Sequence, residues 1–457
     1  MPSSTFTQIL ILGIGACLAA LLVIVGMRRP WWVTVAAIAA LPLVPSWVGV
    51  NVSIFFVNAH LALALLAIAS ILVSRPWAFR LHAVDLAVVA ALVVLLGLAL
   101  LHVASLSHAY ALFQGLVAYT LGRVAAERFG LRRIFTVVAI AFGTAAVLLL
   151  VEAAAALNLW TTYVRVPNSQ FAAWSSIQYR GGVARSEGAF GHSIAAGGSM
   201  AIAAVLALDS SLKPWLRLTG VAVMGAAILT TFSRIGMITA AIGITLALFA
   251  ARTTLATRAR TAVLCILGAG GAAFALGSAS VFAESGAEAA NSASYRVWIL
   301  DLLTTLEPFG FASSYSRSTA GGSSFGNYES IDNAVLHFAL SNGWVLTLVL
   351  LCLLAAALLP VARRTAGVAG VALVAQVPSL FMVALITQYS MVFWLCAGLA
   401  VAEVVSTNQR EDLERSRRHP PVSLLDSASS GVPSLVSLSA AEPALTDVST
   451  ALTRGER

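Results

Sequence analysis

The feature that most constrains the fold of this chain is a series of apolar runs, many of them roughly 20 residues long, that follow one another along most of its length. A helix of about 20 apolar residues spans the hydrocarbon core of a bilayer, so each run is a candidate membrane span. Hydrophobic residues make up 59% of the chain and charged residues only 10%, whereas soluble domains are about 25% charged. We therefore predict an all-α, polytopic transmembrane helix bundle.

Thirteen apolar segments can be marked, with ends near 7–27, 31–49, 54–74, 84–102, 107–123, 134–157, 190–208, 215–232, 234–251, 261–282, 332–359, 366–386 and 388–405. We predict 12–13 spans, because the second and third segments need not both cross the bilayer completely. Together the segments define a transmembrane domain over residues 1–405. From Ser406 the sequence mixes charged residues with Ser, Pro and Ala without an apolar period, so 406–457 is predicted to be a disordered cytoplasmic tail.

The basic residues predict the orientation of the spans, because short cytoplasmic loops are enriched in Lys and Arg. Alternate short loops contain nearly all of the basic short-loop residues, namely Arg28 and Arg29, Arg75 and Arg80, Arg123 to Arg133, Lys213 and Arg217, Arg252 to Arg260, and Arg363 and Arg364. This pattern predicts an external N-terminus. It also places two long loops, 158–189 and 283–331, on the external side, where we expect them to carry short helices.

The remaining composition argues against several classes of site. The net charge of +8 follows the loop pattern of a membrane protein, so membrane lipids are expected partners and nucleic acid is not. The four cysteines lie within apolar segments, and neither a disulfide framework nor a zinc site is expected. No metal or other cofactor is predicted.

Arg234 is the basic residue that this topology does not explain. It lies in TTFSRIGM, in a hairpin of almost no length between two apolar segments on the predicted external side. A charge at that depth is costly and usually faces a cavity. Ser233 can cap the helix that follows, and a capped helix N-terminus beside a guanidinium favours a phosphate. The alternative is an interfacial arginine that reaches lipid phosphate.

Two further arginines stand at the edges of the long loops. Arg296 begins an amphipathic stretch in which Trp298 and Leu302 follow the helical spacing typical of a helix on the membrane interface, or it is an ordinary solvated arginine. Arg185 begins RSEGAFGHSIAAGGSM, whose glycines permit tight turns and close helix packing. His192 in that stretch is a candidate ligand or proton carrier, or a residue that caps the next helix.

The stretch ESIDNAVLHFALSNGWVLTLVLL brings polar residues into the start of the predicted span 332–359. Asp332 is either the N-cap of this helix or a group that acts on a substrate. Asn333 and His337 share a neighbouring helix face, and His337 is either reactive or a histidine that hydrogen-bonds at an interface. At about 100° per residue, Asp332 and His337 point roughly 140° apart, so helix geometry does not pair them as a dyad.

Together these elements resemble the O-antigen ligase and O-antigen polymerase superfamily of bacterial integral membrane glycosyltransferases. The resemblance covers a core of about 185–345 and is carried by FSRIG at 232–236, RVW at 296–298, PFGFASS at 308–314 and DNAVLHFALSNG at 332–343. In ligases of this family a histidine typically precedes the asparagine of the last element. Asp332 stands there in this chain, which is the form more familiar among polymerase-like members.

The resemblance implies an inverting, metal-independent glycosyltransferase of the bacterial cytoplasmic membrane, with its active site facing outside and a role in cell-envelope or exopolysaccharide biosynthesis. The implied partners are a glycan donor linked to undecaprenyl pyrophosphate and a glycan or lipid-glycan acceptor. The predicted catalytic residues are Asp332, His337, Arg234 and Arg296. The predicted substrate-binding residues are Arg185, Arg234, Arg296 and Asn333.

A secondary transporter or a lipid-linked glycan flippase is the alternative function. It predicts helices broken near mid-membrane and internal repeats, whereas the polar elements of this sequence gather on the side of the two long loops. The sequence does not determine whether the protein is a polymerase or a ligase. It also does not determine the identity of the glycan, the identity of the acceptor or the oligomeric state. It also leaves open whether Asp332 or His337 receives the proton of the acceptor.

Overall fold

The computed structural model of the protein describes residues 24, 26, 28–52, 55–74, 79–251, 260–265, 268, 270–272, 294–317 and 323–418. Contacts divide the chain into two units, Met1–Asn408 and Gln409–Arg457, and the helical bundle belongs to the first. Most of the predicted segment 7–27 and most of the predicted segment 261–282 lie outside the described residues.

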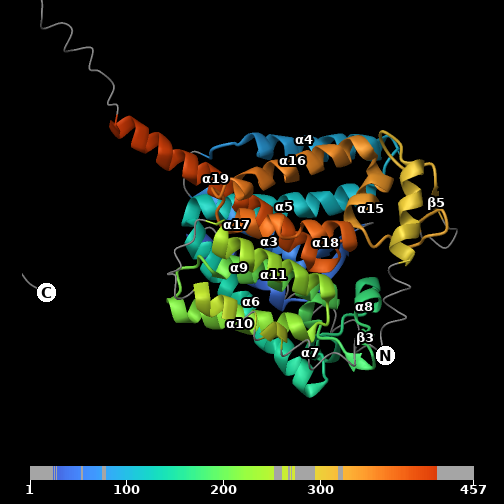
Figure 1. Ribbon diagram of the computed structural model, residues 1–457. Helices are drawn as coiled ribbons and strands as arrows, with labels where there is room; N and C mark the ends of the chain where they lie inside the picture. The colour runs from blue at the N-terminus through green and yellow to red at the C-terminus, as the bar shows by residue number, and fades with distance from the viewer. Residues whose placement is uncertain are drawn as a thin grey trace, which may run out of the picture. The chain divides into compact units, whose positions relative to one another are not determined.

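The described chain is mostly helical, as predicted (Figure 1). The longer helices are α2 (Pro30–Leu43), α3 (Ala59–Ser74), α4 (Ala83–Leu100), α5 (Leu106–Phe129), α6 (Leu131–Ala155), α9 (Ser193–Ala207), α10 (Pro214–Thr230), α11 (Arg234–Phe249), α16 (Trp344–Ala362) and α19 (Thr387–Arg418). Shorter helices are α7 (Leu159–Tyr163), α8 (Ser169–Trp174), η1 (Gly188–Phe190), η2 (Ile299–Thr305), α15 (Ala334–Asn342), α17 (Val368–Val374) and α18 (Val377–Met382).

Three antiparallel two-stranded hairpins correct the strictly all-α prediction for the described residues. They are β1–β2 (Gly49–Val52 with Phe55–Asn58), β3–β4 (Tyr179–Arg180 with Val183–Ala184) and β5–β6 (Tyr315–Arg317 with Ser323–Phe325). The first lies where one predicted apolar segment ends at residue 49 and the next begins at residue 54, and its valines and phenylalanines favour strands. The other two lie within the long loops.

Four described helices are long and apolar enough to cross a membrane: α4, α6, α16 and the segment Thr387–Gln409 of α19. Helices α2, α3, α9, α10 and α11 and the segment Val368–Met382 are apolar but shorter. These findings support a membrane protein, and the count of 12–13 spans stays a prediction.

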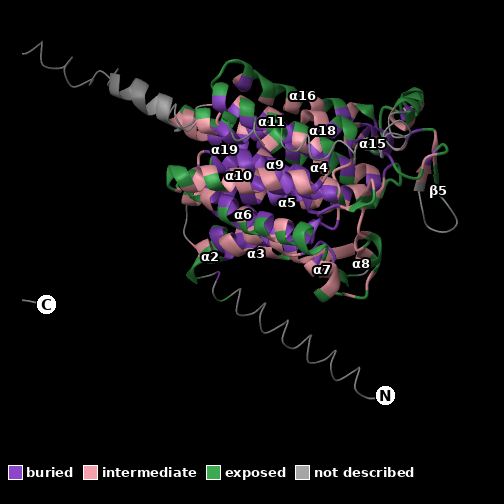
Figure 2. Ribbon diagram, turned by 60° about the horizontal axis from the view of Figure 1, so that its bottom comes forward, coloured by how far each residue is buried: buried purple, intermediate pink, exposed green. Residues whose placement is uncertain are grey.

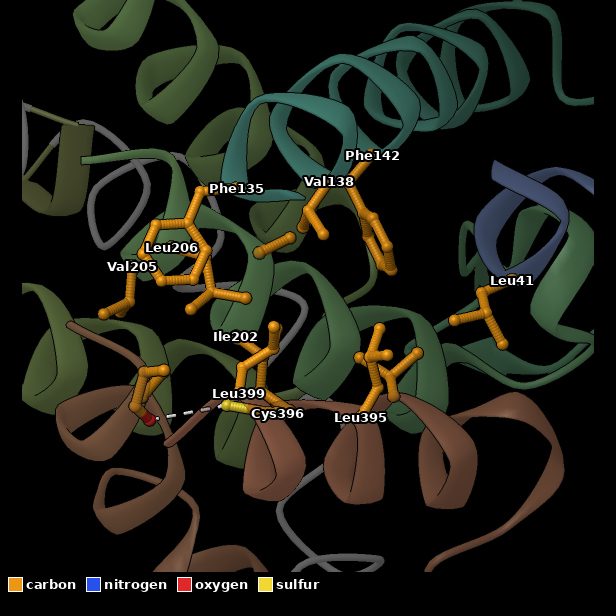
Figure 3. Close-up of a cluster of buried hydrophobic side chains, with 14 of the residues drawn as sticks. Leu41, Phe135, Val138, Phe142, Ile202, Val205, Leu206, Leu395, Cys396 and Leu399 are labelled. Atoms are coloured by element: carbon orange, nitrogen blue, oxygen red, sulfur yellow. Dashed lines mark hydrogen bonds between the residues drawn. The ribbon is translucent and has the colours of Figure 1, made fainter. Parts of the chain in front are cut away.

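The centre of the bundle is α9, which packs against α6, α10, α11 and α17. All of its residues from Ala195 onward are buried (Figure 2). Figure 3 shows the apolar contacts around it, with Phe135 and Phe142 of α6 and Leu399 of α19 drawn together with Ile202 of α9. Small residues on α9 allow this packing, as is common between membrane helices.

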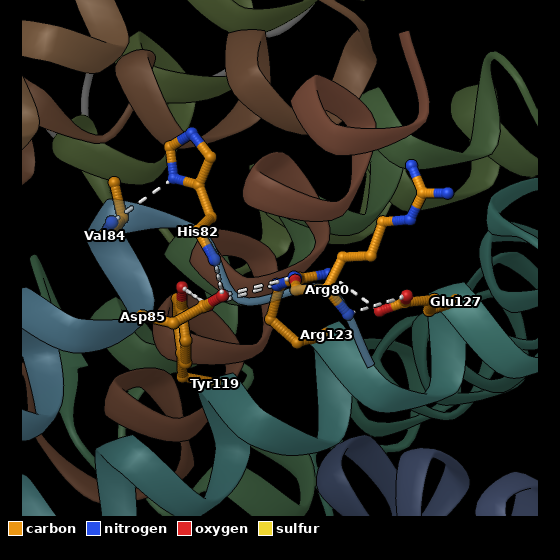
Figure 4. A network of polar contacts seen from close by, with 7 residues as sticks. All are labelled: Arg80, His82, Val84, Asp85, Tyr119, Arg123 and Glu127. Atoms are coloured by element: carbon orange, nitrogen blue, oxygen red, sulfur yellow. Dashed lines mark hydrogen bonds and ion pairs between the residues drawn. The ribbon is translucent and has the colours of Figure 1, made fainter. Parts of the chain in front are cut away.

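A buried ion pair joins α4 to α5 (Figure 4). Arg123 Nε lies 3.1 Å from Asp85 Oδ1, and the Tyr119 hydroxyl donates to the same carboxylate over 2.5 Å. Arg123 also donates to the backbone oxygen of Arg80. Arg123, predicted to lie in a short loop, lies within α5, which continues to Phe129. Its buried charge is paired with Asp85, and the predicted orientation of the spans stays a prediction.

The predicted single span 332–359 is wrong, because Gly343 breaks it into α15 and α16. Gly343 has φ +93° and ψ 155°, a backbone conformation almost restricted to glycine. A Cβ on this residue would lie 2.4 Å from the backbone oxygen of Pro308. The amide of Trp344 donates to the oxygen of Glu307, so α16 begins against the segment that precedes the turn at Gly310.

The C-terminal boundaries also differ from the prediction. Segment 366–386 is divided into α17 and α18, and Glu403 of α19 accepts hydrogen bonds from the first free amides of α17, Ala369 and Gly370. Helix α19 continues to Arg418. The predicted start of the tail, Ser406, therefore lies inside this helix. Residues 419–457 of that tail lie outside the described residues.

Candidate functional site

The long-loop segments, α15 and the turn before α11 lie at one end of the bundle, which we call the loop end. The amide of Ser186 donates to the oxygen of Thr230, and the amide of Ala334 donates to the oxygen of Val383. Helix α18 packs against both α11 and α15. In Figures 1 and 2, α7, α8, α15 and β5 gather on the same side of the bundle. The loop end therefore brings most of the predicted site segments to one region.

The turn before α11 has the capped geometry that the sequence predicts. The Ser233 hydroxyl accepts a hydrogen bond from the amide of Gly236 over 3.2 Å, which confirms Ser233 as the N-cap. Arg234 is the first residue of α11 and is exposed. Its side chain therefore starts at the positive end of the helix dipole, where an anion is stabilised.

Two loop arginines hold this turn in place. Arg180 Nη1 donates to the oxygen of Phe232 over 2.7 Å, and Arg185 Nε donates to the oxygen of Thr231 over 2.9 Å. Arg185 is buried. Arg185 therefore stabilises the backbone of the turn. Its predicted contact with a substrate stays a prediction. Arg180 was not a predicted site residue, although it belongs to a YRGG turn whose two glycines have positive φ, which was a usable signal.

Two buried carboxylates, Glu152 and Glu187, lie against the backbone of this loop, and neither was predicted as a site residue. Glu152 accepts hydrogen bonds from the amides of Glu187 and Gly188 and from the side chain of Asn158. Glu187 accepts from the amide of Gln178 over 3.0 Å, and its Oε2 has no hydrogen-bond partner among the described residues. Burial raises the pKa of Glu187 to about 7; the Glu152 carboxylate acts in the same direction, and the Gln178 hydrogen bond opposes both.

The start of α15 corrects one of the two predictions for Asp332. Asn333 is the N-cap, because its Oδ1 accepts from the amide of Leu336 over 2.9 Å, and Asn333 is buried. Asp332 precedes the cap and is exposed. Capping therefore does not account for the carboxylate of Asp332. The predicted substrate contact of Asn333 stays a prediction, since its oxygen is used by the helix.

The segment that contains Arg296 lies beside Asp332. The Tyr295 hydroxyl donates to the backbone oxygen of Ser330, and the Tyr295 ring packs edge-to-face on Tyr328. Burial raises the pKa of Tyr295, and the nearby negative charge of Asp332 raises it further. Arg296 is half-buried, and its Nε has no hydrogen-bond partner among the described residues.

The helical segment after Arg296 buries a different set of residues from the predicted pair Trp298 and Leu302. Leu302 is buried with Ile299, but Trp298 is 57% exposed. The reason is that η2 is a 3₁₀ helix, whose repeat of three residues aligns positions 299 and 302 and turns position 298 away.

The two predicted histidines have different surroundings. His192 caps α9, because its Nδ1 accepts from the amide of Ile194, which is one of the two alternatives considered for it. His337 packs edge-to-face against the ring of His108, with centroids 5.1 Å apart, and against Phe325 at 6.1 Å. His108 was not a predicted site residue. Within the part of the chain that the structure describes, no three His, Cys, Asp or Glu side chains are grouped as metal ligands.

Comparison of the chain with models of protein families, with curated proteins and with solved structures finds no match.

The carboxyl of Glu187 predicts a pH dependence for the loop end. Its pKa in the folded protein, about 7, lies above the ordinary value of 4.5, so the folded state binds the proton more tightly than the unfolded state. Stability should therefore fall as pH rises from about 4.5 through about 7, by an amount on the order of a few kcal/mol, and stay low above that.

Glu187→Gln should remove this loss, because an amide oxygen can still accept from Gln178 and carries no charge. The measurement is the thermal unfolding midpoint of the purified protein in detergent between pH 5 and pH 8. Glu329→Gln, at an exposed loop carboxylate, is the control and should leave the pH dependence unchanged. An unchanged pH dependence in Glu187→Gln would show that Glu187 is ionised at little cost.

Proposed function

We propose that this protein is a membrane glycosyltransferase of the O-antigen ligase or polymerase type. It transfers or polymerises a glycan from an undecaprenyl-pyrophosphate donor onto an acceptor hydroxyl at the outer face of the bacterial cytoplasmic membrane. The observation that carries the proposal is the loop end, where the capped turn of Arg234 lies at the same end of the bundle as Asp332 and the segment of Arg296.

The charges at the loop end suit the departure of a pyrophosphate. In this reaction the bond between the anomeric carbon and the pyrophosphate oxygen breaks, and negative charge grows on the leaving group. Fixed donors aimed at developing charge are an effective means of catalysis. Arg234 at the positive end of α11 provides such a donor, and Arg180 and Arg185 hold the turn that presents it. Arg296 is the second proposed donor.

The acceptor side of the reaction is assigned to the start of α15. The acceptor hydroxyl must lose its proton as it attacks the anomeric carbon, and a positioned carboxylate or imidazole can take up that proton. Asp332 is exposed and is not the helix cap, so its carboxylate can face a substrate. His337 lies in the first turn of α15, which begins two residues after Asp332.

A transporter or glycan flippase remains the second candidate, favoured by the breaks between α15 and α16 and between α17 and α18. Discontinuous helices that meet at mid-membrane are typical of transporter sites. The break at Gly343 does not have the mid-membrane position of a transporter site. Gly343 lies against Pro308 and Phe309, and the nearby amide of Phe311 donates to the oxygen of Val103 in the turn after α4. It therefore lies at an end of α4, which supports the enzyme over the transporter.

Replacement of Arg234 tests the anion site. Arg234→Lys keeps the positive charge but loses the planar, bidentate donor, so we expect a strong loss of activity with normal membrane insertion. The measurement is complementation of a deletion strain, read as the envelope glycan pattern. Arg165→Lys, at an exposed arginine of the long loop 158–189, should complement fully. Full complementation by Arg234→Lys would remove the pyrophosphate assignment.

Replacement of Asp332 tests the acceptor side. Since Asn333 caps α15, Asp332→Asn should leave the folded amount of protein unchanged, yet it should lower the rate roughly 100-fold, within the range for loss of a group that orients the acceptor or takes its proton. The rate is measured as formation of undecaprenyl diphosphate by membranes that contain equal amounts of protein. Asp301→Asn, at an exposed carboxylate of η2, is the matched control. Equal rates in the two variants would exclude a role for Asp332 with the acceptor.

A further inference from the structure

The pairing of His108 with His337 is a feature of the loop end that the family resemblance does not include. His108 lies in the first turn of α5, where its amide donates to the oxygen of the N-cap residue Ser105. His337 lies in the first turn of α15, where its amide donates to the oxygen of the N-cap residue Asn333 over 2.8 Å. The two helices are far apart in the sequence, yet they bring the imidazole rings of His108 and His337 into contact.

The geometry fixes the ring of His337 on two sides. The His108 ring meets it at an interplanar angle of 78°, and the Phe325 ring meets it at 83°. Phe325 is buried in a small apolar cluster with Leu336 and Leu340 of α15, so this second ring is itself held in place. An imidazole between two edge-to-face partners has one preferred orientation.

The electrostatics of the pair favour the neutral form of the His337 ring. Both imidazoles lie at the positive ends of helix dipoles, which disfavour a cation. A positive charge on either ring also repels one on the other across 5.1 Å between centroids. The neutral form of both rings is therefore favoured, and a neutral imidazole is the form that a general base needs.

We propose that His108 is a positioning residue for the transfer reaction, which holds the neutral ring of His337 in the orientation that meets the acceptor hydroxyl. This rests on the proposed function. Asp332, outside the cap of the same helix, then orients the acceptor, and His337 takes the proton.

The oxygen of the acceptor hydroxyl forms a bond to the anomeric carbon, and its proton passes to His337. The bond between the anomeric carbon and the pyrophosphate oxygen breaks, and its electron pair leaves with undecaprenyl diphosphate. The proton on His337 is released to water before the next turnover. No oxidant, reductant or metal is required.

The test compares His108→Ala, His108→Phe, His337→Ala and the double variant His108→Ala with His337→Ala. The full-length protein is purified, reconstituted in vesicles and supplied with the lipid extract of a deletion strain, in which the glycan donor accumulates. Undecaprenyl diphosphate release is measured per folded, monodisperse protein, which separates catalysis from a loss of stability. His108→Phe preserves an aromatic partner for His337, so it remains informative if His108→Ala fails to fold.

We expect His108→Ala to lower kcat by about 10- to 100-fold, as is typical of a misplaced catalytic group, with the KM for the lipid extract unchanged. His108→Phe should restore most of kcat. The double variant should be no slower than His337→Ala, because residues that act as one unit are not additive. Losses that multiply in the double variant, an unchanged kcat in His108→Ala, or an inactive but folded His108→Phe would each overturn the proposal.

The same experiment separates this inference from the proposed function. Release by the wild-type protein together with one of those contrary results overturns only the role of His108. An absence of release by the wild-type protein, from an extract that contains both the accumulated donor and an acceptor, overturns the glycosyltransferase itself and the inference with it.

Discussion

The loop end depends on the close approach of α9 to α11 at Gly197 and Gly236. A Cβ on Gly236 would lie 3.0 Å from the Cα of Gly197, so a side chain at either position would push the two helices apart. Within a membrane, close packing of small residues supplies much of the energy that holds helices together. The contact sets where α11 begins, and therefore where Ser233 caps it and where Arg234 leaves the bundle. Arg185 then fixes the preceding turn from the long loop.

The two halves of the proposed chemistry use opposite features of helix ends. At α11, an exposed arginine adds to the positive dipole end and favours an anion. At α15, an exposed carboxylate precedes a helix whose first turn presents an imidazole packed against a second one. A leaving group that gains negative charge and a hydroxyl that loses a proton need these different surroundings. Their placement at one end of the bundle is the reason to assign them to one reaction.

The sequence predicted the positions of most helices, because hydrophobic runs of sufficient length leave few alternatives to a helix in a membrane. It also predicted the Ser233 cap, which depends only on local residues. It did not predict the break at Gly343, because an apolar run does not reveal that the backbone of Pro308 and Phe309 leaves no room for a side chain there.

The candidate site was less accessible from sequence, because its organisation depends on contacts between distant segments. The structure places the N-cap of α15 at Asn333, one residue after the predicted candidate Asp332. Local propensity cannot distinguish the two positions, since Asp and Asn both cap well. Arg180 and Glu187 acquire their roles only when the long loop folds over the turn before α11. His108 is unremarkable in the sequence until α5 and α15 bring it against His337.

The most direct test of the central claim is deletion of the gene, followed by electrophoresis of the envelope glycans and analysis of the lipid-linked intermediates. A glycosyltransferase of the proposed type predicts that glycan linked to undecaprenyl pyrophosphate accumulates. Loss of long chains with single units retained would identify a polymerase, and loss of attachment with lipid-linked polymer retained would identify a ligase. An unchanged glycan pattern without accumulation of the lipid-linked donor would contradict the account.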